Sequence, residues 1–284
     1  MNAKEPRVAL VSLFALTAFA ANSILARLAL GSSAIDPAAF SAIRLASGAI
    51  MLSGLTLFRD RNSAVLASGG TWISALMLFT YAACFSFAYQ SLTTGTGALI
   101  LFGSVQATMI IAGLFAGDRP NRREWAGLIL AMCGLVYLVS PGLEAPEPVG
   151  AVLMMMAGIA WGWYSLRGRG IGDPLRVTTG NFIRTLPFAL LLCVFAFGLS
   201  SVSSNGALLA VGSGSVASGI GYVVWYTALR GLTAARASII QLAVPLIAAL
   251  GGVLFLSEEI SARLIFSAVF ILGGIALALF SRTR

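Results

Sequence analysis

Residues 36–58 read DPAAFSAIRLASGAIMLSGLTLF: an Asp-Pro pair opens a run of 22 mostly apolar residues that contains one charged residue, Arg44. About 20 apolar residues in an α-helix are long enough to cross the roughly 30 Å hydrocarbon core of a bilayer. Ten such runs occur along the chain. They are Val8–Leu30, Pro37–Phe58, Gly70–Gln90, Gly95–Ala116, Trp125–Ser140, Val149–Leu166, Val177–Gly198, Gly206–Leu229, Ala234–Leu256 and Leu264–Phe280. The sequence therefore predicts an all-α, multi-pass membrane protein with ten transmembrane helices.

Composition supports this prediction and excludes several kinds of chemistry. Of the 284 residues, 58% are hydrophobic and 10% are charged, against roughly 45–50% and about 25% in soluble domains. The absence of histidine excludes serine–histidine nucleophiles and histidine-bound metals. The cysteines Cys84, Cys133 and Cys193 stand singly in apolar runs, without a metal-binding spacing. We expect no cofactor and no metal.

Basic residues alternate between the connections of these runs. One set of connections holds Lys4, Arg7, Arg59, Arg61, Arg119, Arg122, Arg123, Arg167, Arg169, Arg176, Arg230, Arg236, Arg282 and Arg284. The other set holds Asp36, Glu144, Glu147, Glu258 and Glu259, with Arg263 as its clear base. Short loops rich in basic residues stay on the cytoplasmic side of a membrane. We therefore expect a protein of a bacterial-type inner membrane with both termini on its cytoplasmic side. The net charge of +8 then reflects topology and not a nucleic-acid partner.

The second half of the chain repeats features of the first. Asp36-Pro37 and Arg44 recur as Asp173-Pro174 and Arg184. The segment 114–118, LFAGD, recurs as 254–258, LFLSE, and Gly134 then aligns with Gly274. Five runs in each half give the halves opposite directions, which is typical of transporters with inverted repeats. The predicted repeats are residues 1–142 and 143–284.

Over nearly the whole chain, these features resemble the EamA family of the drug/metabolite transporter superfamily. Further cues are the sequence YTAL at 226–229 and the acidic ends of the fourth and ninth runs. The first half departs from the pattern at two positions: it has Gln106 where the second half has Pro245, and Gly97 where the second half has Arg236. Within the family the chain looks like the YddG-type exporters of aromatic and other hydrophobic amino acids. The resemblance implies a central cavity between the two inverted repeats, with the fifth and tenth helices at the periphery.

Polar and aromatic side chains at depth are the candidates for a substrate site, because a polar group facing lipid is costly. The candidates are Tyr81, Phe85, Phe102, Gln106, Trp161, Trp163, Tyr164, Tyr222, Trp225, Ser238 and Gln241. Aromatic rings favour flat or apolar solutes, and the two amides suit a zwitterion, although they can equally bond a neighbouring helix. For Ser215 and Ser218 helix packing is the favoured interpretation. Pro245 and Gly95, Gly97 and Gly103 are candidate bending points.

Arg44 and Arg184 each lie about two turns inside a run, from opposite sides. Either can bind a substrate carboxylate, or serve as a scaffold by bonding helix ends and backbone carbonyls. Their duplicated position favours the scaffold.

Of the ten acidic residues none lies inside a run, so the chain lacks the buried carboxylate with which proton-driven pumps exchange cationic drugs. We therefore expect a monomeric or weakly dimeric carrier that exports a neutral solute by alternating access, as a uniporter or coupled without a buried acid. The alternatives are export of hydrophobic drugs, nucleosides or sugars, and a membrane channel. An intramembrane enzyme is not expected, because paired acids, a His-Glu-x-x-His motif and a buried lysine are all missing.

Overall fold

The computed structural model describes residues 4–31, 33–92, 94–117, 119, 121–139, 147–196, 202–256 and 262–279. In these ranges the chain is helical, with one isolated backbone bridge between Ile35 and Val202. Some predicted features lie outside the described residues. These are the ends of three runs (Ser140, Gly198 and Phe280), the acids Asp118, Glu144, Glu258 and Glu259, and the terminal bases Arg282 and Arg284.

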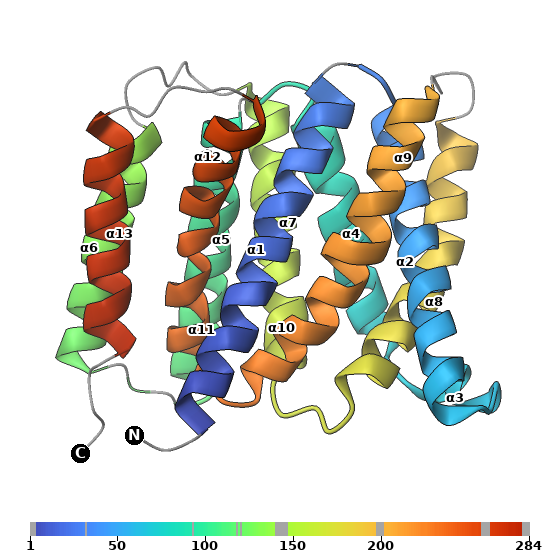
Figure 1. Cartoon of the computed structure of the whole chain (residues 1–284), viewed down its shortest axis with the longest axis horizontal. Coiled ribbons are helices and arrows are strands. Elements are labelled where there is room, and N and C mark those ends of the chain that lie inside the picture. The colour runs from blue at the N-terminus through green and yellow to red at the C-terminus, as the bar shows by residue number, and fades with distance from the viewer. Residues whose placement is uncertain are drawn as a thin grey trace.

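The long helices of the first half run up and down the bundle in turn, and the short helix α3 lies at one end of it (Figure 1). Their bounds are α1 (Lys4–Gly31), α2 (Pro37–Asp60), α3 (Ala64–Ser68), α4 (Trp72–Ala88), α5 (Thr94–Phe115) and α6 (Arg122–Val139). The second half continues with α7 (Pro148–Arg167), α8 (Pro174–Phe195), α9 (Ser204–Gly212), the π-helical segment η1 (Ser213–Ile220), α10 (Gly221–Leu229), α11 (Ala234–Gln241), α12 (Ala243–Leu256) and α13 (Ala262–Leu279). Each predicted run falls on one of these helices or on a consecutive group of them.

Within the described ranges, five segments are long and apolar enough to cross a membrane: Val8–Gly31, Pro37–Asp60, Pro148–Arg167, Pro174–Phe195 and Ser204–Leu229. Shorter apolar helices cover Trp72–Ala88, Ile100–Phe115 and Ile239–Ala248. Large apolar side chains such as Phe58, Phe115 and Phe195 are exposed on the outer surface. In water this surface would be a liability, and in lipid it needs no cover.

The Asp-Pro pairs mark helix starts. Asp36 caps α2 by accepting hydrogen bonds from the backbone N–H groups of Ala38 (2.8 Å) and Ala39 (3.3 Å), and Asp173 caps α8 by accepting from that of Arg176 (3.1 Å). Proline follows each acid, where its missing N–H costs nothing and its fixed φ suits a helix. Glu147 and Pro148 start α7 in the same way. The repeated motif is therefore a repeated helix start.

Helices α6 and α13 pair at one edge of the bundle (Figure 1), as the family resemblance implies for the fifth and tenth helices. The aligned glycines Gly134 and Gly274 both lie in this contact. A Cβ on Gly134 would lie 2.7 Å from the Cβ of Phe270, and one on Gly274 would lie 2.6 Å from the carbonyl oxygen of Gly127. Both positions need glycine because the two helices approach so closely.

Two groups of consecutive helices, α9–η1–α10 and α11–α12, are interrupted near their middle. The π-helical segment η1 separates α9 from α10, and a break at Leu242 separates α11 from α12, three residues before Pro245. A proline lacks the N–H that would bond the preceding turn, so a break at this point has a direct cause. Helix α5 runs without a break through Gly97 and Gly103.

Candidate functional site

A cluster of aromatic side chains fills the space between the two halves. The ring of Trp161 on α7 lies near the rings of Tyr222 on α10 (centroids 4.6 Å apart), Tyr81 on α4 (5.0 Å) and Phe19 on α1 (5.1 Å). Further rings surround these: Phe85, Tyr164, Phe182 and Trp225. All eight are buried. We call this set the ring cluster; it offers flat apolar surfaces for dispersion and stacking with a flat or apolar solute.

A polar network borders the ring cluster. The Nε atom of Arg44 on α2 donates to the hydroxyl of Ser218 on η1 (2.9 Å), and its Nη2 atom donates to the hydroxyls of Tyr222 (2.7 Å) and Tyr81 (3.4 Å). Asn22 on α1 extends the network by donating to the Tyr81 hydroxyl (3.5 Å) and accepting a hydrogen bond from Ser213. Five elements from both halves thus meet in one buried polar network.

The amide of Gln241 connects the ring cluster to α5. Its Oε1 accepts a hydrogen bond from the indole Nε1 of Trp161 (2.7 Å), and its Nε2 donates to the sulfur of Met109 (3.3 Å). Phe102 and Gln106 are buried on the same face of α5 as Met109, at helical spacing. Gln241 is also the last residue of α11, so this contact lies where the helix breaks.

Two further bonds fix the rings of α10 against α7. The Nε1 of Trp225 donates to the hydroxyl of Ser165 (3.1 Å), and the hydroxyl of Tyr226 donates to the carbonyl oxygen of Tyr164 (2.8 Å). A buried indole or phenol usually finds such a partner. These bonds tie two helices of the second half together, whereas the contacts of Trp161 extend to the first half.

The structure does not unite all of the predicted site residues. Trp163 is 48% exposed, because two residues along a helix turn the side chain by about 200° away from Trp161. Ser238 lies on α11, and its side chain is outside the described part of the structure. Ser215 donates to the carbonyl oxygen of Val211 on its own helical rod (2.7 Å), whereas Ser218 accepts from Arg44, so packing alone is the wrong interpretation for Ser218.

The two duplicated arginines have different surroundings. The Nη1 atom of Arg184 donates to the carbonyl oxygens of Gly69 (2.5 Å) and Gly180 (2.9 Å), and its guanidinium lies over the ring of Trp72. Those contacts match the scaffold interpretation. In the part of the chain that the structure describes, the hydrogen bonds of Arg44 go to side-chain hydroxyls inside the polar network.

Sequence reasoning missed four members of the site: Phe19, Asn22, Phe182 and Ser213. The signal for Asn22 was present, because it is a polar amide within an apolar run. Phe19 and Phe182 carried no such signal, since phenylalanine is equally at home in lipid and in the core.

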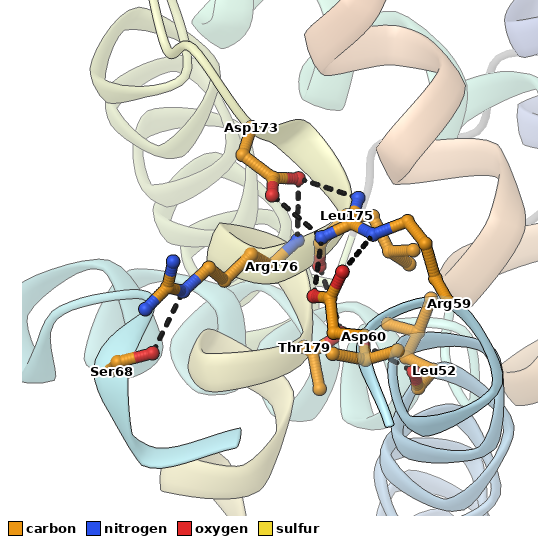
Figure 2. Close-up of polar contacts among 9 residues, drawn as sticks. Leu52, Arg59, Asp60, Ser68, Asp173, Leu175, Arg176 and Thr179 are labelled. Carbon is orange, nitrogen blue, oxygen red and sulfur yellow. Dashed lines mark hydrogen bonds and ion pairs between the residues drawn. The ribbon is translucent and has the colours of Figure 1, made fainter. Parts of the chain in front are cut away.

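At the end of the bundle where α1 begins (Figure 1), an ion pair joins α2 to α8 (Figure 2). The guanidinium of Arg59 binds both carboxylate oxygens of Asp173, at 3.1 and 2.7 Å, and also binds its neighbour Asp60. Next to this pair, the Nε of Arg176 donates to the hydroxyl of Ser68 on α3 (2.7 Å). The hydrogen bonds from Arg59 hold the pKa of the Asp173 carboxyl below its ordinary value.

At the opposite end, the two halves meet through backbone groups. The N–H of Ser203 donates to the carbonyl oxygen of Ala34 (2.9 Å), and Ile35 bridges Val202. Among the described residues, the halves are therefore tied at both ends of α2, by an ion pair at one end and by backbone bonds at the other.

Comparison with known proteins shows the family and the fold of this chain. The model of the EamA-like transporter family matches the chain twice, over residues 7–140 and 148–280. The chain belongs to the EamA-like transporter family. A solved crystal structure superposes with a TM-score of 0.81 at 20% identity, covering 98% of this chain and 99% of that one, which shows a shared fold.

Relatives of this EamA-family chain occur in several bacteria. An uncharacterized protein of Pseudomonas aeruginosa is 49% identical over 98% of this chain and 96% of its own length. The uncharacterized transporter YoaV of Bacillus subtilis is 24% identical over 88% of this chain and 89% of its own. A protein of Escherichia coli named "Probable amino-acid metabolite efflux pump" is 21% identical over 81% of this chain and 85% of its own. The chain is thus a membrane transporter by family.

Proposed function

We propose that this transporter exports aromatic or other hydrophobic amino acids, or similar small metabolites, through a site formed by the ring cluster and the polar network. The observation that carries the proposal is the position of Trp161: its indole contacts the rings of Tyr81 and Tyr222 from both halves and bonds Gln241 at a helix break. Rings suit an aromatic or apolar side chain, and the hydroxyls and amide suit the polar end of an amino acid.

We propose ten membrane crossings arranged as two inverted five-helix repeats, residues 1–142 and 143–284, with both termini in the cytoplasm. In this arrangement α9, η1 and α10 form one crossing, and α11 and α12 form another. The paired Asp-Pro helix starts and the reciprocal glycines of α6 and α13 support the repeat. A site near mid-depth, beside interrupted helices, is the usual position in transporters built this way.

We propose alternating access, and the ties at both ends of α2 support it. The Arg59–Asp173 pair closes one end and the contact of Ala34 with Ser203 closes the other. Opening one while the other stays closed would expose the ring cluster to one side of the membrane at a time. The exposed ion pair is weak enough to break in each cycle.

Coupling does not run through a buried carboxylate at the site in this proposal. Among the described residues the buried acid is Glu124, which lies in the first turn of α6 and pairs with Arg236 on α11 (3.3 Å). It accepts a hydrogen bond from the N–H of Asn121, whose side chain in turn caps this helix, so its role is accounted for by the helix start.

The test is exchange in liposomes that contain the purified chain and are preloaded with a mixed amino-acid pool. We expect saturable uptake of external radiolabelled tryptophan or phenylalanine that depends on the same class of solute inside. Uptake that stays linear with concentration, together with single-channel currents, would identify a pore. Exchange of nucleosides or sugars without exchange of any amino acid would replace the proposed substrate class.

A further inference from the structure

The guanidinium of Arg44 is a buried cation whose charge the described residues do not balance. The side chain is 0% exposed, and its hydrogen-bond partners are three neutral hydroxyls on Ser218, Tyr81 and Tyr222. The Nη1 atom is buried without a hydrogen-bond partner. In the described part of the chain the acids that pair with arginine are Asp60, Asp173 and Glu124, each with another arginine.

Burying this charge without an opposite charge costs folding free energy, and the arginine cannot avoid that cost by losing its proton. An arginine stays charged in proteins, and a buried charge needs an opposite charge or a full set of hydrogen bonds. The rings of Tyr81 and Phe85 help, since the Cζ atom lies 5.2 and 5.5 Å from their centroids. Neither ring supplies an anion, so the positive charge and the free Nη1 group together define a site for one.

Arg184, the arginine at the repeated position, is only partly buried and is bonded differently. Its Nη1 atom bonds two backbone carbonyls, whose partial negative charge spreads the cation's field. Arg44 lacks such carbonyl bonds and lies instead beside the ring cluster, because Tyr81 and Tyr222 contact both Arg44 and Trp161. A ligand with an anionic end and a flat apolar end would fit both features at once.

We propose that Arg44 binds the carboxylate of the transported solute through its Nη1 side while the ring cluster holds the apolar part. This inference rests on the proposed function and narrows its substrate class to monocarboxylates. No buried acid stands beside the ring cluster among the described residues to match an ammonium group. A carboxylate without an amine therefore binds as well as the amino acid, and an amine without a carboxylate does not.

The test compares four probes that share an indole ring: tryptophan, indole-3-propionate, tryptophan amide and tryptamine. Their dissociation constants are measured by calorimetry on the full-length wild-type chain in lipid nanodiscs, so the result does not depend on the folding of any variant. Loss of a hydrogen-bonded charge weakens binding by roughly 10- to 100-fold. We expect the two carboxylates to bind at least tenfold more tightly than the amide and the amine.

A variant links this preference to Arg44. In Arg44→Gln, tryptophan and its amide should have equal dissociation constants. Arg184→Gln, at the repeated but carbonyl-bonded position, should keep the wild-type preference for tryptophan over the amide. Equal binding of tryptophan and its amide to the wild type would overturn the inference and leave the proposed function standing. Absence of binding for all four probes, with no tryptophan exchange in liposomes, would overturn both.

Discussion

The hydrogen bond between Trp161 and Gln241 gives a sharp test of the site's architecture. The indole Nε1 donates to the amide Oε1 at 2.7 Å, and both side chains are buried. Trp161→Phe keeps an aromatic ring in the cluster and removes the donor. The Oε1 atom of Gln241 then loses the one partner that the structure gives it.

An orphaned buried acceptor costs about 1–3 kcal/mol of folding free energy. Loss of the larger ring adds a cavity cost to this. Gln241→Met, which keeps the side-chain length, orphans the indole donor and costs a similar amount. In the double variant neither orphan exists, so it should be more stable than the sum of the single effects predicts by the two orphan costs together, about 2–6 kcal/mol.

Equilibrium unfolding of the purified variants in mixed micelles measures these free energies. Trp163→Phe is the matched control, because Trp163 is on the same helix and is 48% exposed; its effect should stay within about 0.5 kcal/mol. Tryptophan exchange should fall in Trp161→Phe and persist in the control. Additivity of the two single variants to within about 0.5 kcal/mol would refute the reasoning, as would a loss of exchange in Trp163→Phe equal to that in Trp161→Phe.

Three other predictions concern the ends and contacts of α2 and the topology. Asp173→Asn keeps a capping side chain on α8 but removes the ion pair with Arg59, at a cost of about 0.2–1 kcal/mol that high salt abolishes; Asp36→Asn, which caps α2 at the repeated position, should cost less in the same unfolding assay. Because the pKa of Asp173 is lowered in the folded state, the pair's contribution is present at neutral pH and is lost as pH falls through that pKa; an unchanged acid profile in Asp173→Asn would contradict this. Gly48→Ala should reduce the yield of folded protein, since its Cβ would contact the ring of Phe182 and lie 2.9 Å from the carbonyl oxygen of Gly214, an overpacking cost of about 1–3 kcal/mol. Gly54→Ala on the same helix meets nothing within 4 Å and should be neutral or stabilising, and equal yields of the two variants would count against the close α2–η1 contact. Alkaline phosphatase fused after Gly170 should be inactive and after Ser203 active, and the reverse pattern would invert the proposed topology.

The order and direction of the helices were predictable from the sequence because they depend on local properties. Run length and apolar content place each helix. The Asp-Pro pair at 36–37 sets the start of α2 to the residue, whereas α8 starts at Pro174, three residues before the predicted run Val177–Gly198. Pro245 predicts a bend in the ninth run, and the helix breaks three residues before it, at Leu242, since proline disrupts a helix when it lies inside one. No such local signal exists in SGSVASGI for the π-helical segment at 213–220, because its geometry depends on the helices packed against it.

What the sequence by itself determined is a membrane-embedded, twofold-repeated transporter whose candidate site is built from rings, amides and two arginines. Only the tertiary structure decided which of these side chains meet. Trp161 enters the ring cluster and Trp163 faces outward, although both are tryptophans on one helix. Arg44 is enclosed by hydroxyls and Arg184 bonds carbonyls, although the two mark the same motif. The physical reason is that the apolar content of a segment decides whether it lies in lipid or in water, whereas the hydrogen-bond partners of a buried polar group come from other helices.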